Sequence, residues 1–227
     1  MMITNKQNFN DRELEILWLS AIFQITYGFM FLNKLKIIHC DTKPRNILYS
    51  RSDSLNTHNR YVVGNQSFDV PMNHYIFKIA DFGSVQILGS TLNTMEDKKI
   101  QEYIDNRGDL YDLSRIWYRV LVDYCRNSYG WNQIRPIMDS NPEYKRYHDD
   151  QKTKLDNELR HLPQNTRDKM LLRAMIYHGI ENNFINEDDI IAKHSLVKPP
   201  KLVMGVLDGL VNMNIKNVFD LFPMFCT

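Results

Sequence analysis

The longest uncharged stretch of the chain lies near its start. Residues 16–32 carry no charged side chain and are rich in Leu, Ile and Phe. A membrane span needs about 20 mostly apolar residues, whereas this stretch is shorter and is interrupted by polar side chains. It therefore predicts a helix that is buried on most sides in a soluble domain. Asn10 and Glu13 have the spacing of a capping box, so we expect the helix to run from about residue 11 to residue 32.

Two short apolar stretches follow, on either side of a polar loop. The loop, residues 39–46, holds a proline that keeps the residue before it out of helical geometry. Residues 75–80 alternate as a short strand, whereas residues 51–74 are polar and rich in Asn, Ser and His. We therefore expect strands 47–50 and 75–80 to pair as a hairpin, with residues 51–74 as a polar surface insertion between them.

The rest of the chain is predicted to be mostly helical, although the mixed charges of residues 144–162 indicate a solvated face or a loop. Residues 197–227 are predicted to form a C-terminal tail helix, and the aromatic residues within 219–225 indicate a docking tail rather than a ligand pocket. The whole chain, residues 1–227, is thus predicted to be a single domain, mainly α with a small β-hairpin. Apolar residues recur at helical spacing over residues 109–123, 166–177 and 202–213.

Composition narrows the classes of function. The chain has 28 Lys and Arg against 27 Asp and Glu, a net charge of +1, which gives no electrostatic reason to expect a nucleic acid or a membrane as partner. Its three scattered cysteines, Cys40, Cys125 and Cys226, argue against a disulfide framework and for the cytoplasm or another reducing intracellular compartment. The first residues are polar, unlike a secretory signal, and the histidines do not cluster at zinc-ligand spacing.

One set of polar residues suits phosphate chemistry. Asp41 and Asp81 are expected at neighbouring ends of the hairpin, and Asn46 lies in the same loop as Asp41. Two carboxylates and an amide oxygen form the hard oxygen set that Mg²⁺ prefers. Lys43 can place a cation on a transferring phosphoryl group, and Gly83 allows a backbone turn that a side chain would hinder. A carboxylate, a lysine and metal ligands around one point favour phosphoryl transfer.

These residues resemble the signatures of the protein kinases. Residues 39–46, His-Cys-Asp-Thr-Lys-Pro-Arg-Asn, are similar to the kinase catalytic loop, and residues 81–83, Asp-Phe-Gly, match the family's second motif. The buried helix before the loop has the place of the long helix that feeds the catalytic loop. Asp109 resembles an aspartate at the start of the family's central helix. The resemblance covers roughly residues 10–125 and implies a kinase-like C-terminal lobe, since two ordered motifs with a strand between them are a specific signal.

The resemblance implies a role for each site residue. Asp41 would be the catalytic base that accepts the proton of the substrate hydroxyl, and Lys43 would contact the γ-phosphate of ATP. Asn46 and Asp81 would hold Mg²⁺ and thereby the nucleotide. The lysine at position 43 is similar to that of serine/threonine kinases, so the implied substrate is a protein hydroxyl. Structural support is implied for His39, as a packed, hydrogen-bonded histidine, and for Phe82, Gly83 and Asp109, the last of which holds the loop backbone or caps its own helix.

Two departures from the family concern regulation and peptide binding. Position 40 is Cys, where many kinases have an Arg that pairs with a phosphorylated activation loop, so we expect this control to be absent. Only 25 residues separate Gly83 from Asp109, and no Ala-Pro-Glu follows Gly83. The predicted activation segment is therefore short, and the expected peptide-binding platform departs from that of the family.

A third departure lies at the front of the chain. The first ten residues are too few for the kinase N-terminal lobe, and the nine glycines never form GxGxxG. The sequence therefore predicts a C-terminal lobe alone, either truncated or completed by another chain, with a partner or self-association at the surface that such a lobe would cover. Two alternatives remain open: an inactive kinase-like interaction module, and a small-molecule phosphotransferase of kinase-like fold, against which Lys43 counts.

Overall fold

The computed structural model describes residues 10–51, 58–72, 75–116, 120, 122, 125, 129–194, 196–211 and 217–227. The chain divides into two compact units where the sequence predicts one domain. The first unit combines Met1–Ile116 with Val197–Thr227, and the second is Trp117–Leu196. The prediction of a mainly helical chain with a small antiparallel hairpin is confirmed.

The first unit is built around α1 (Asp11–Lys34), which begins where the sequence predicts and ends two residues later. The capping box is present: Asn10 Oδ1 accepts a hydrogen bond from the Glu13 amide, and Glu13 Oε2 accepts one from the Asn10 amide, both at 2.9 Å. By length and composition α1 could cross a membrane, but most of its apolar stretch is buried inside the protein. Its buried side chains include Leu17, Trp18, Phe23 and Phe29.

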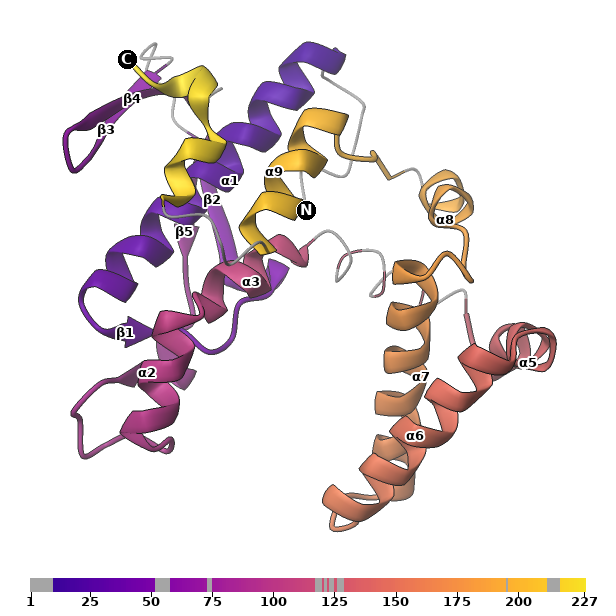
Figure 1. Ribbon diagram of the computed structural model, residues 1–227. Helices are drawn as coiled ribbons and strands as arrows, with labels where there is room; N and C mark the ends of the chain where they lie inside the picture. The colour runs from indigo at the N-terminus through magenta and orange to yellow at the C-terminus, as the bar shows by residue number, and fades with distance from the viewer. Residues whose placement is uncertain are drawn as a thin grey trace. The chain divides into compact units, whose positions relative to one another are not determined.

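The predicted hairpin is confirmed. Strand β2 (Ile47–Arg51) pairs antiparallel with β5 (Tyr75–Ile79), and Tyr49 lies opposite Phe77. Helix α1 packs along β5, as Figure 1 shows. A Cβ atom on Gly28 of α1 would lie 2.8 Å from the terminal side-chain carbon of Ile79 in β5, so a larger residue there would require the Ile79 side chain to move.

Gln24 of α1 joins the helix to the backbone of β5. Its Oε1 accepts a hydrogen bond from the Phe77 amide at 3.0 Å, and its Nε2 donates to the Tyr75 carbonyl at 3.4 Å and to Ser20 Oγ at 3.0 Å. Ser20 and Gln24, two of the polar side chains inside this apolar helix, are therefore buried and paired. Together they fix the position of α1 along the hairpin.

The segment between β2 and β5 differs from the predicted polar surface insertion. Strands β3 (His58–Val63) and β4 (Gln66–Pro71) form a second antiparallel hairpin, and Gly64 in its turn has φ +60°. Phe68 and Val70 of β4 are buried, because they alternate along one face of the strand. Residues 52–57 and 73–74 of the predicted insertion lie outside the described residues.

The C-terminal part of the chain returns to α1. Helix α9 (Lys201–Val211) packs against α3 (Gly108–Ser114) and two 3-10 turns follow, η4 (Val218–Leu221) and η5 (Pro223–Phe225). The predicted helices 109–123 and 202–213 are thus present in part, and their remaining residues lie partly outside the described chain.

The aromatic tail docks on its own chain. The rings of Phe219, Phe222 and Phe225 lie 5.4, 5.1 and 5.8 Å from the ring of Phe23, and Phe68 of β4 lies 5.2 Å from the same ring. The expected docking tail is therefore part of the core of the first unit rather than a free extension.

A short strand precedes the predicted site residues, and a second short strand and a helix follow them. Strand β1 (Ile37–Ile38) pairs antiparallel with β6 (Gln86–Ile87), and α2 (Asp97–Asp105) buries its isoleucines against β1. Two 3-10 turns carry parts of the motifs, η2 (Pro44–Asn46) and η3 (Phe82–Ser84).

The second unit is helical. It contains α5 (Trp131–Ser140), α6 (Pro142–Glu158), α7 (Gln164–Glu181) and α8 (Glu187–Lys193), and α6 and α7 lie side by side in Figure 1. Helix α7 confirms the prediction for residues 166–177.

Helix α6 covers most of residues 144–162, for which the sequence predicts a solvated face or a loop. Asn141 caps this helix, because its Oδ1 accepts hydrogen bonds from the amides of Glu143 and Tyr144 at 3.0 and 3.1 Å. Tyr144 is the one buried residue of α6, so the sequence pattern correctly indicated a solvated surface but missed the helix.

Candidate functional site

The polar loop between β1 and β2 has a conformation set by two local features. Cys40 adopts φ +61°, which turns the chain sharply after β1. Lys43 is extended, with φ −148° and ψ 158°, as expected for a residue before proline. The turn η2 then carries Asn46, which is buried, into β2. The loop thus holds Asp41 and Lys43 at the surface and anchors the chain on either side of them.

The loop brings three predicted site residues together. Lys43 Nζ donates a hydrogen bond to Asp41 Oδ2 and forms an ion pair with it. Asn46 Nδ2 donates to the same carboxylate oxygen at 3.0 Å and to the Asp41 carbonyl at 2.9 Å. The hydrogen bond from Lys43, helped by that from Asn46, lowers the pKa of Asp41 below its usual value. The Asp41 carboxylate is therefore ionised at neutral pH.

Asp109, at the start of α3, holds the backbone of this loop. Its Oδ2 accepts a hydrogen bond from the His39 amide at 2.8 Å, and its Oδ1 accepts one from the Cys40 amide at 3.2 Å. Thr42 Oγ1 donates to the same carboxylate at 3.3 Å. Burial raises the pKa of Asp109, and the hydrogen bonds from the His39 and Cys40 amides oppose that rise. This is the position that the resemblance implies for Asp109.

His39 is buried and connects the loop to the end of β5. Its Nδ1 accepts a hydrogen bond from the Asp41 amide at 3.3 Å, so its Nε2 carries the hydrogen that is directed to the Ala80 carbonyl at 3.0 Å. The ring lies 5.9 Å from that of Phe29 and 5.2 Å from that of Phe82. His39 is a packed, hydrogen-bonded histidine, as predicted.

Asp81 follows β5 directly and lies beside the loop. The Ala80 amide donates to the Asn46 carbonyl at 2.8 Å, which joins the two predicted motifs. Asp81 is exposed and adopts φ +65°. Among the described residues its carboxylate has no hydrogen-bond or ion-pair partner. It is therefore free to bind a ligand from solution.

The turn after β5 corrects the role expected for Gly83. The residue with the left-handed conformation is Asp81, whereas Gly83 does not have a positive φ. A Cβ atom on Gly83 would meet Asp81 Oδ1 at 3.4 Å, an ordinary contact, so the backbone turn does not require glycine there. Phe82 is 48% exposed, and its ring makes an edge-to-face contact with the ring of His39.

The site offers too few oxygen atoms to bind a divalent cation unless a bound nucleotide and water supply the others. Asp81 and the side-chain oxygen of Asn46 are hard oxygen donors without a hydrogen-bond partner among the described residues. That part of the chain contains no group of three His, Cys, Asp or Glu side chains that could hold a metal ion. Mg²⁺ commonly binds through one or two protein oxygens, with phosphate and water oxygens completing the shell. Asn46 and Asp81 therefore fit Mg²⁺ carried by a nucleotide.

The segment after Asp81 is ordered by its own side chains, which sequence reasoning missed. Gln86 Oε1 accepts hydrogen bonds from the amides of Thr94 and Met95 at 2.9 and 3.1 Å. Asn93 pairs with both backbone groups of Ile87, at 2.9 and 2.7 Å. Asn and Gln in a turn-rich stretch are the signal that could have indicated this, because such side chains often bond to nearby backbone.

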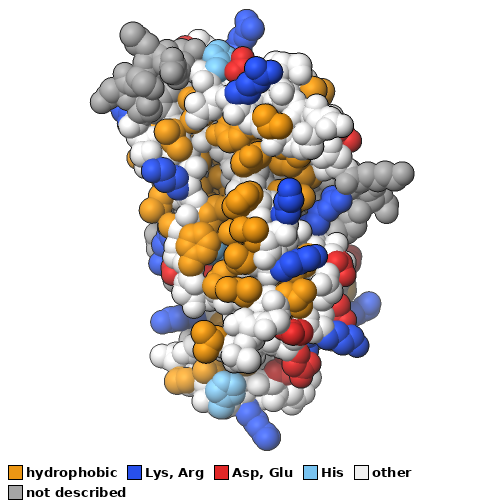
Figure 2. Space-filling view, turned by 90° about the vertical axis from the view of Figure 1, so that its left-hand side faces the viewer, with side chains coloured by type: hydrophobic (Ala, Val, Ile, Leu, Met, Phe, Trp, Pro, Cys, Tyr) orange, Lys and Arg blue, Asp and Glu red, His pale blue; other side chains and the backbone are white. Residues whose placement is uncertain are grey.

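Several large apolar side chains of the first unit remain exposed. Figure 2 shows a face of the molecule on which hydrophobic side chains gather, with lysine and arginine side chains among them. On the hairpin, Tyr49 is 49% exposed, and its ring lies 5.8 Å from that of Tyr75 and 6.5 Å from that of Phe77. Among the described residues, the exposed large hydrophobic residues of the first unit are Phe31, Leu35, Leu48, Tyr49, Val62, Phe82, Ile87, Leu92, Leu202 and Met224.

Cavities elsewhere do not include Asp41, Lys43, Asn46 or Asp81. A cavity of about 410 Å³ in the second unit is lined by Tyr129, Ile137 and Ile190 together with polar residues of α5 and α8. A much smaller one, of about 10 Å³, adjoins Asp109. At the predicted site, Asp81 is exposed, the side chains of Asp41 and Lys43 are partly exposed, and Asn46 is buried.

Comparisons with models of known protein families, with curated proteins and with solved structures find no match to this chain.

Proposed function

We propose that the chain is the catalytic lobe of a serine/threonine protein kinase, with a kinase-like fold. It would transfer the γ-phosphoryl group of ATP to a protein hydroxyl with the help of Mg²⁺. The observation that carries the proposal is the convergence of Asp41, Lys43 and Asn46 at one point, with Asp81 joined to them through the bond between Ala80 and Asn46. These four residue types perform complementary tasks in phosphoryl transfer.

Each side chain has a task that its surroundings support. The lowered pKa of Asp41 keeps its carboxylate ionised, so it can orient the substrate hydroxyl and accept its proton. Lys43 neutralises that carboxylate in the free protein and can turn to the γ-phosphate when ATP binds. Asn46 and Asp81 would hold Mg²⁺, which offsets the negative charge of the phosphates when it is bound.

The proposed reaction needs a cover over the nucleotide that these residues do not supply. The sequence has no GxGxxG, so we propose that a further segment of a longer chain, another polypeptide or a second copy of the chain covers the site. Exposed apolar side chains near it, such as Tyr49 and Phe82, support such an association. The three cysteines are free thiols, which supports a reducing intracellular location such as the cytoplasm.

A second candidate is a kinase-like binding module without catalysis. The absence of a glycine-rich phosphate loop from the sequence favours it, together with the exposed hydrophobic residues Leu48 and Tyr49. Such a module would use the same surface to hold a partner. It would have no need to bind a nucleotide with Mg²⁺, and this separates the two candidates.

Calorimetry with Mg-ADP tests the proposal. We expect weak, Mg²⁺-dependent binding that Asp81→Asn reduces more than Lys43→Met, because Asp81→Asn removes a charged metal ligand whereas Lys43→Met removes a phosphate contact. Asp69→Asn is the matched control, because Asp69 is exposed on β4 and belongs to the hairpin that does not carry the site. Equal affinities for the wild type and Asp81→Asn would contradict the metal assignment. No binding at all would favour the binding module.

A further inference from the structure

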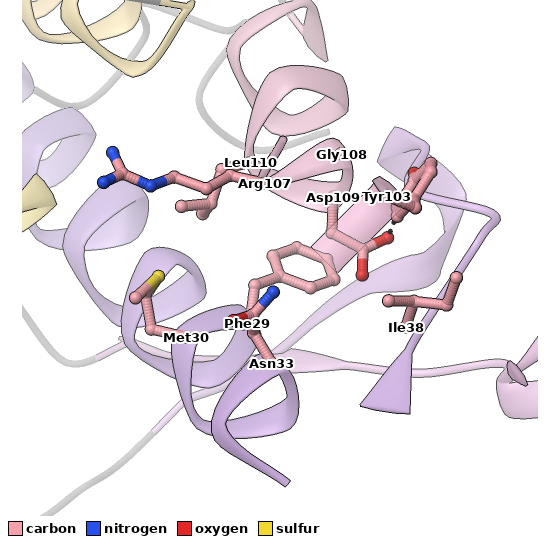
Figure 3. A pocket seen from close by; sticks show the side chains of 9 residues that line it. All are labelled: Phe29, Met30, Asn33, Ile38, Tyr103, Arg107, Gly108, Asp109 and Leu110. Atoms are coloured by element: carbon pink, nitrogen blue, oxygen red, sulfur yellow. Dashed lines mark hydrogen bonds between the residues drawn. The ribbon is translucent and has the colours of Figure 1, made fainter. Parts of the chain in front are cut away.

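Tyr103 connects α2 to the residue that holds the Asp41 loop. Its hydroxyl lies 3.2 Å from Asp112 Oδ2 and 3.5 Å from Asp109 Oδ1, between two carboxylates of α3. Figure 3 shows Tyr103 directed at Asp109, with the interaction drawn between them. The hydroxyl carries a single hydrogen, so it donates to one carboxylate at a time. Tyr103 thus supplies a donor to the acidic start of α3 from a different element.

The position of the Tyr103 ring is fixed by Gly108. A Cβ atom at Gly108 would overlap the ring, so only glycine lets the ring lie against the start of α3. The chain between α2 and α3 turns at Arg107, which has φ +51°. This turn folds the end of α2 back so that the hydroxyl reaches Asp109. The backbone turn and the glycine therefore place the Tyr103 side chain that makes the contact.

Asp109 has little freedom to move once these partners are in place. It is 7% exposed, and the cavity beside it measures about 10 Å³, room for about one water molecule. Figure 3 shows Phe29 and Ile38 around the same cavity. The loop amides of His39 and Cys40 donate to Asp109, so a displacement of its carboxylate would displace the backbone that leads into Asp41.

We propose that Tyr103 is a positioning residue that couples the segment after Asp81 to the Asp41 loop through Asp109. When α2 is docked, the Tyr103 hydroxyl is shared between Asp112, the nearer acceptor, and Asp109, and it limits how far the Asp109 carboxylate can move from the loop amides. When α2 moves away, Asp109 loses a donor and the loop loosens. The effect on phosphoryl transfer rests on the proposed function, but the effect on the loop can be measured without any activity.

The test is backbone amide hydrogen exchange in the variant Tyr103→Phe, which keeps the ring over Gly108 and removes only the hydroxyl. We expect the amides of His39 and Cys40 to exchange about tenfold faster, the size expected for the loss of one hydrogen bond to a carboxylate. The Phe77 amide, which donates to Gln24 in the same unit, should exchange at the wild-type rate.

Tyr144→Phe is the matched control, because it removes another buried tyrosine hydroxyl, which donates to the Met175 carbonyl at 2.5 Å in the second unit. It should leave the His39 and Cys40 amides unchanged. Gly108→Ala displaces the ring of Tyr103 without removing a polar group and should accelerate the same amides, so it replaces Tyr103→Phe if that variant does not fold. Unchanged exchange in the folded variant, or an equal change in Tyr144→Phe, overturns the proposal.

Two further measurements separate coupling through Asp109 from general loosening. If Tyr103 acts through Asp109, Tyr103→Phe should add little to the exchange rates of Asp109→Asn. In an active complex, Tyr103→Phe should lower kcat and leave the KM for ATP unchanged, because it moves the Asp41 loop and no nucleotide contact. Faster loop exchange in a chain that binds no nucleotide would keep the coupling and reject the kinase function. Normal Mg-ADP binding with unchanged amide exchange in Tyr103→Phe would support the kinase function and reject the coupling.

Discussion

The Ala80 amide donates a hydrogen bond of 2.8 Å to the main-chain oxygen of Asn46. It continues the β2–β5 ladder by one step beyond the pair Ile47 and Ile79. The register of the hairpin therefore sets how Asp81, the next residue, lies relative to Asn46. Two segments that are far apart in the sequence are thus joined through backbone pairing alone, so this link does not depend on a ligand.

The chain by itself should transfer phosphate very slowly. Proper orientation of the reacting groups supplies roughly 7–11 kcal/mol of a barrier, and an open site cannot hold the γ-phosphate in line. Radiolabelled transfer from ATP to a generic basic protein measures the rate, with Asp41→Asn as the control. Strong activity from a purified monomer that Asp41→Asn abolishes would show that no cover is needed.

Activity of a complete complex should not require phosphorylation of the segment after Asp81. By the resemblance to the protein kinases, Cys40 stands where many of them have an arginine that binds such a phosphate. Gln86 and Asn93 already order the segment by hydrogen bonds to its backbone. Phosphatase treatment should leave the rate of phosphoryl transfer unchanged. Asn93→Ala should reduce that rate, because it loosens the segment after Asp81. A large loss after phosphatase treatment, with no phosphate found elsewhere, would contradict this prediction.

Phe23→Ala should be among the most destabilising single changes in the first unit. The ring is fully buried and meets four other phenylalanine rings from β4 and the C-terminal tail. Removal of such a ring costs about 3–5 kcal/mol of unfolding free energy. Denaturant unfolding measures it. The control is Phe31→Ala in the same helix, where the side chain is 56% exposed and the expected change is small. Similar losses for both variants would mean that the tail does not dock on α1.

The second unit should lose stability on acidification below about pH 6.5. The ring of His178 stacks on that of Tyr147, with 3.7 Å between the ring centroids. Burial lowers the pKa of His178, although the charges of Glu181 and Glu143 oppose that shift. A folded-state pKa below that of the unfolded chain means that the unfolded state binds more protons in this window. Stability is therefore complete above the unfolded pKa of about 6.5 and falls as the pH decreases toward the folded value.

Thermal unfolding of the second unit between pH 7.5 and about pH 5 measures this dependence. His178→Gln should flatten it, because no imidazole remains to be protonated inside the ring stack. His161→Gln should leave it unchanged, since His161 is exposed. A wild-type curve that is flat over this range would contradict the prediction.

The parts that the sequence predicts correctly rest on local signals. The Asn10–Glu13 capping box spans three residues, and the alternation of 75–80 marks β5 without knowledge of its partner. Similarly, the proline after Lys43 sets the backbone of that residue directly. Such signals depend on covalent geometry and neighbouring side chains, so they can be read without the rest of the fold.

The features that the sequence did not reveal depend on distant partners. Phe68 and Val70 lie in a polar stretch, and their burial depends on the aromatic tail that returns from the C-terminal end. Tyr103 shows no motif in sequence, because its role comes from the turn at Arg107 that brings it to Asp109. The sequence predicts that Gly83 allows the backbone turn of Asp-Phe-Gly, whereas the residue with a positive φ is Asp81.

Gln24 also bears on how the protein avoids aggregation. A hairpin of two strands presents an outer edge whose amides and carbonyls can recruit a strand from another molecule. Gln24 occupies two of these groups on β5, the Phe77 amide and the Tyr75 carbonyl, with a side-chain amide that mimics a neighbouring strand. A leucine there would suit the apolar helix equally well but would leave that edge unpaired. This polar residue inside an apolar helix thus acts against intermolecular strand pairing.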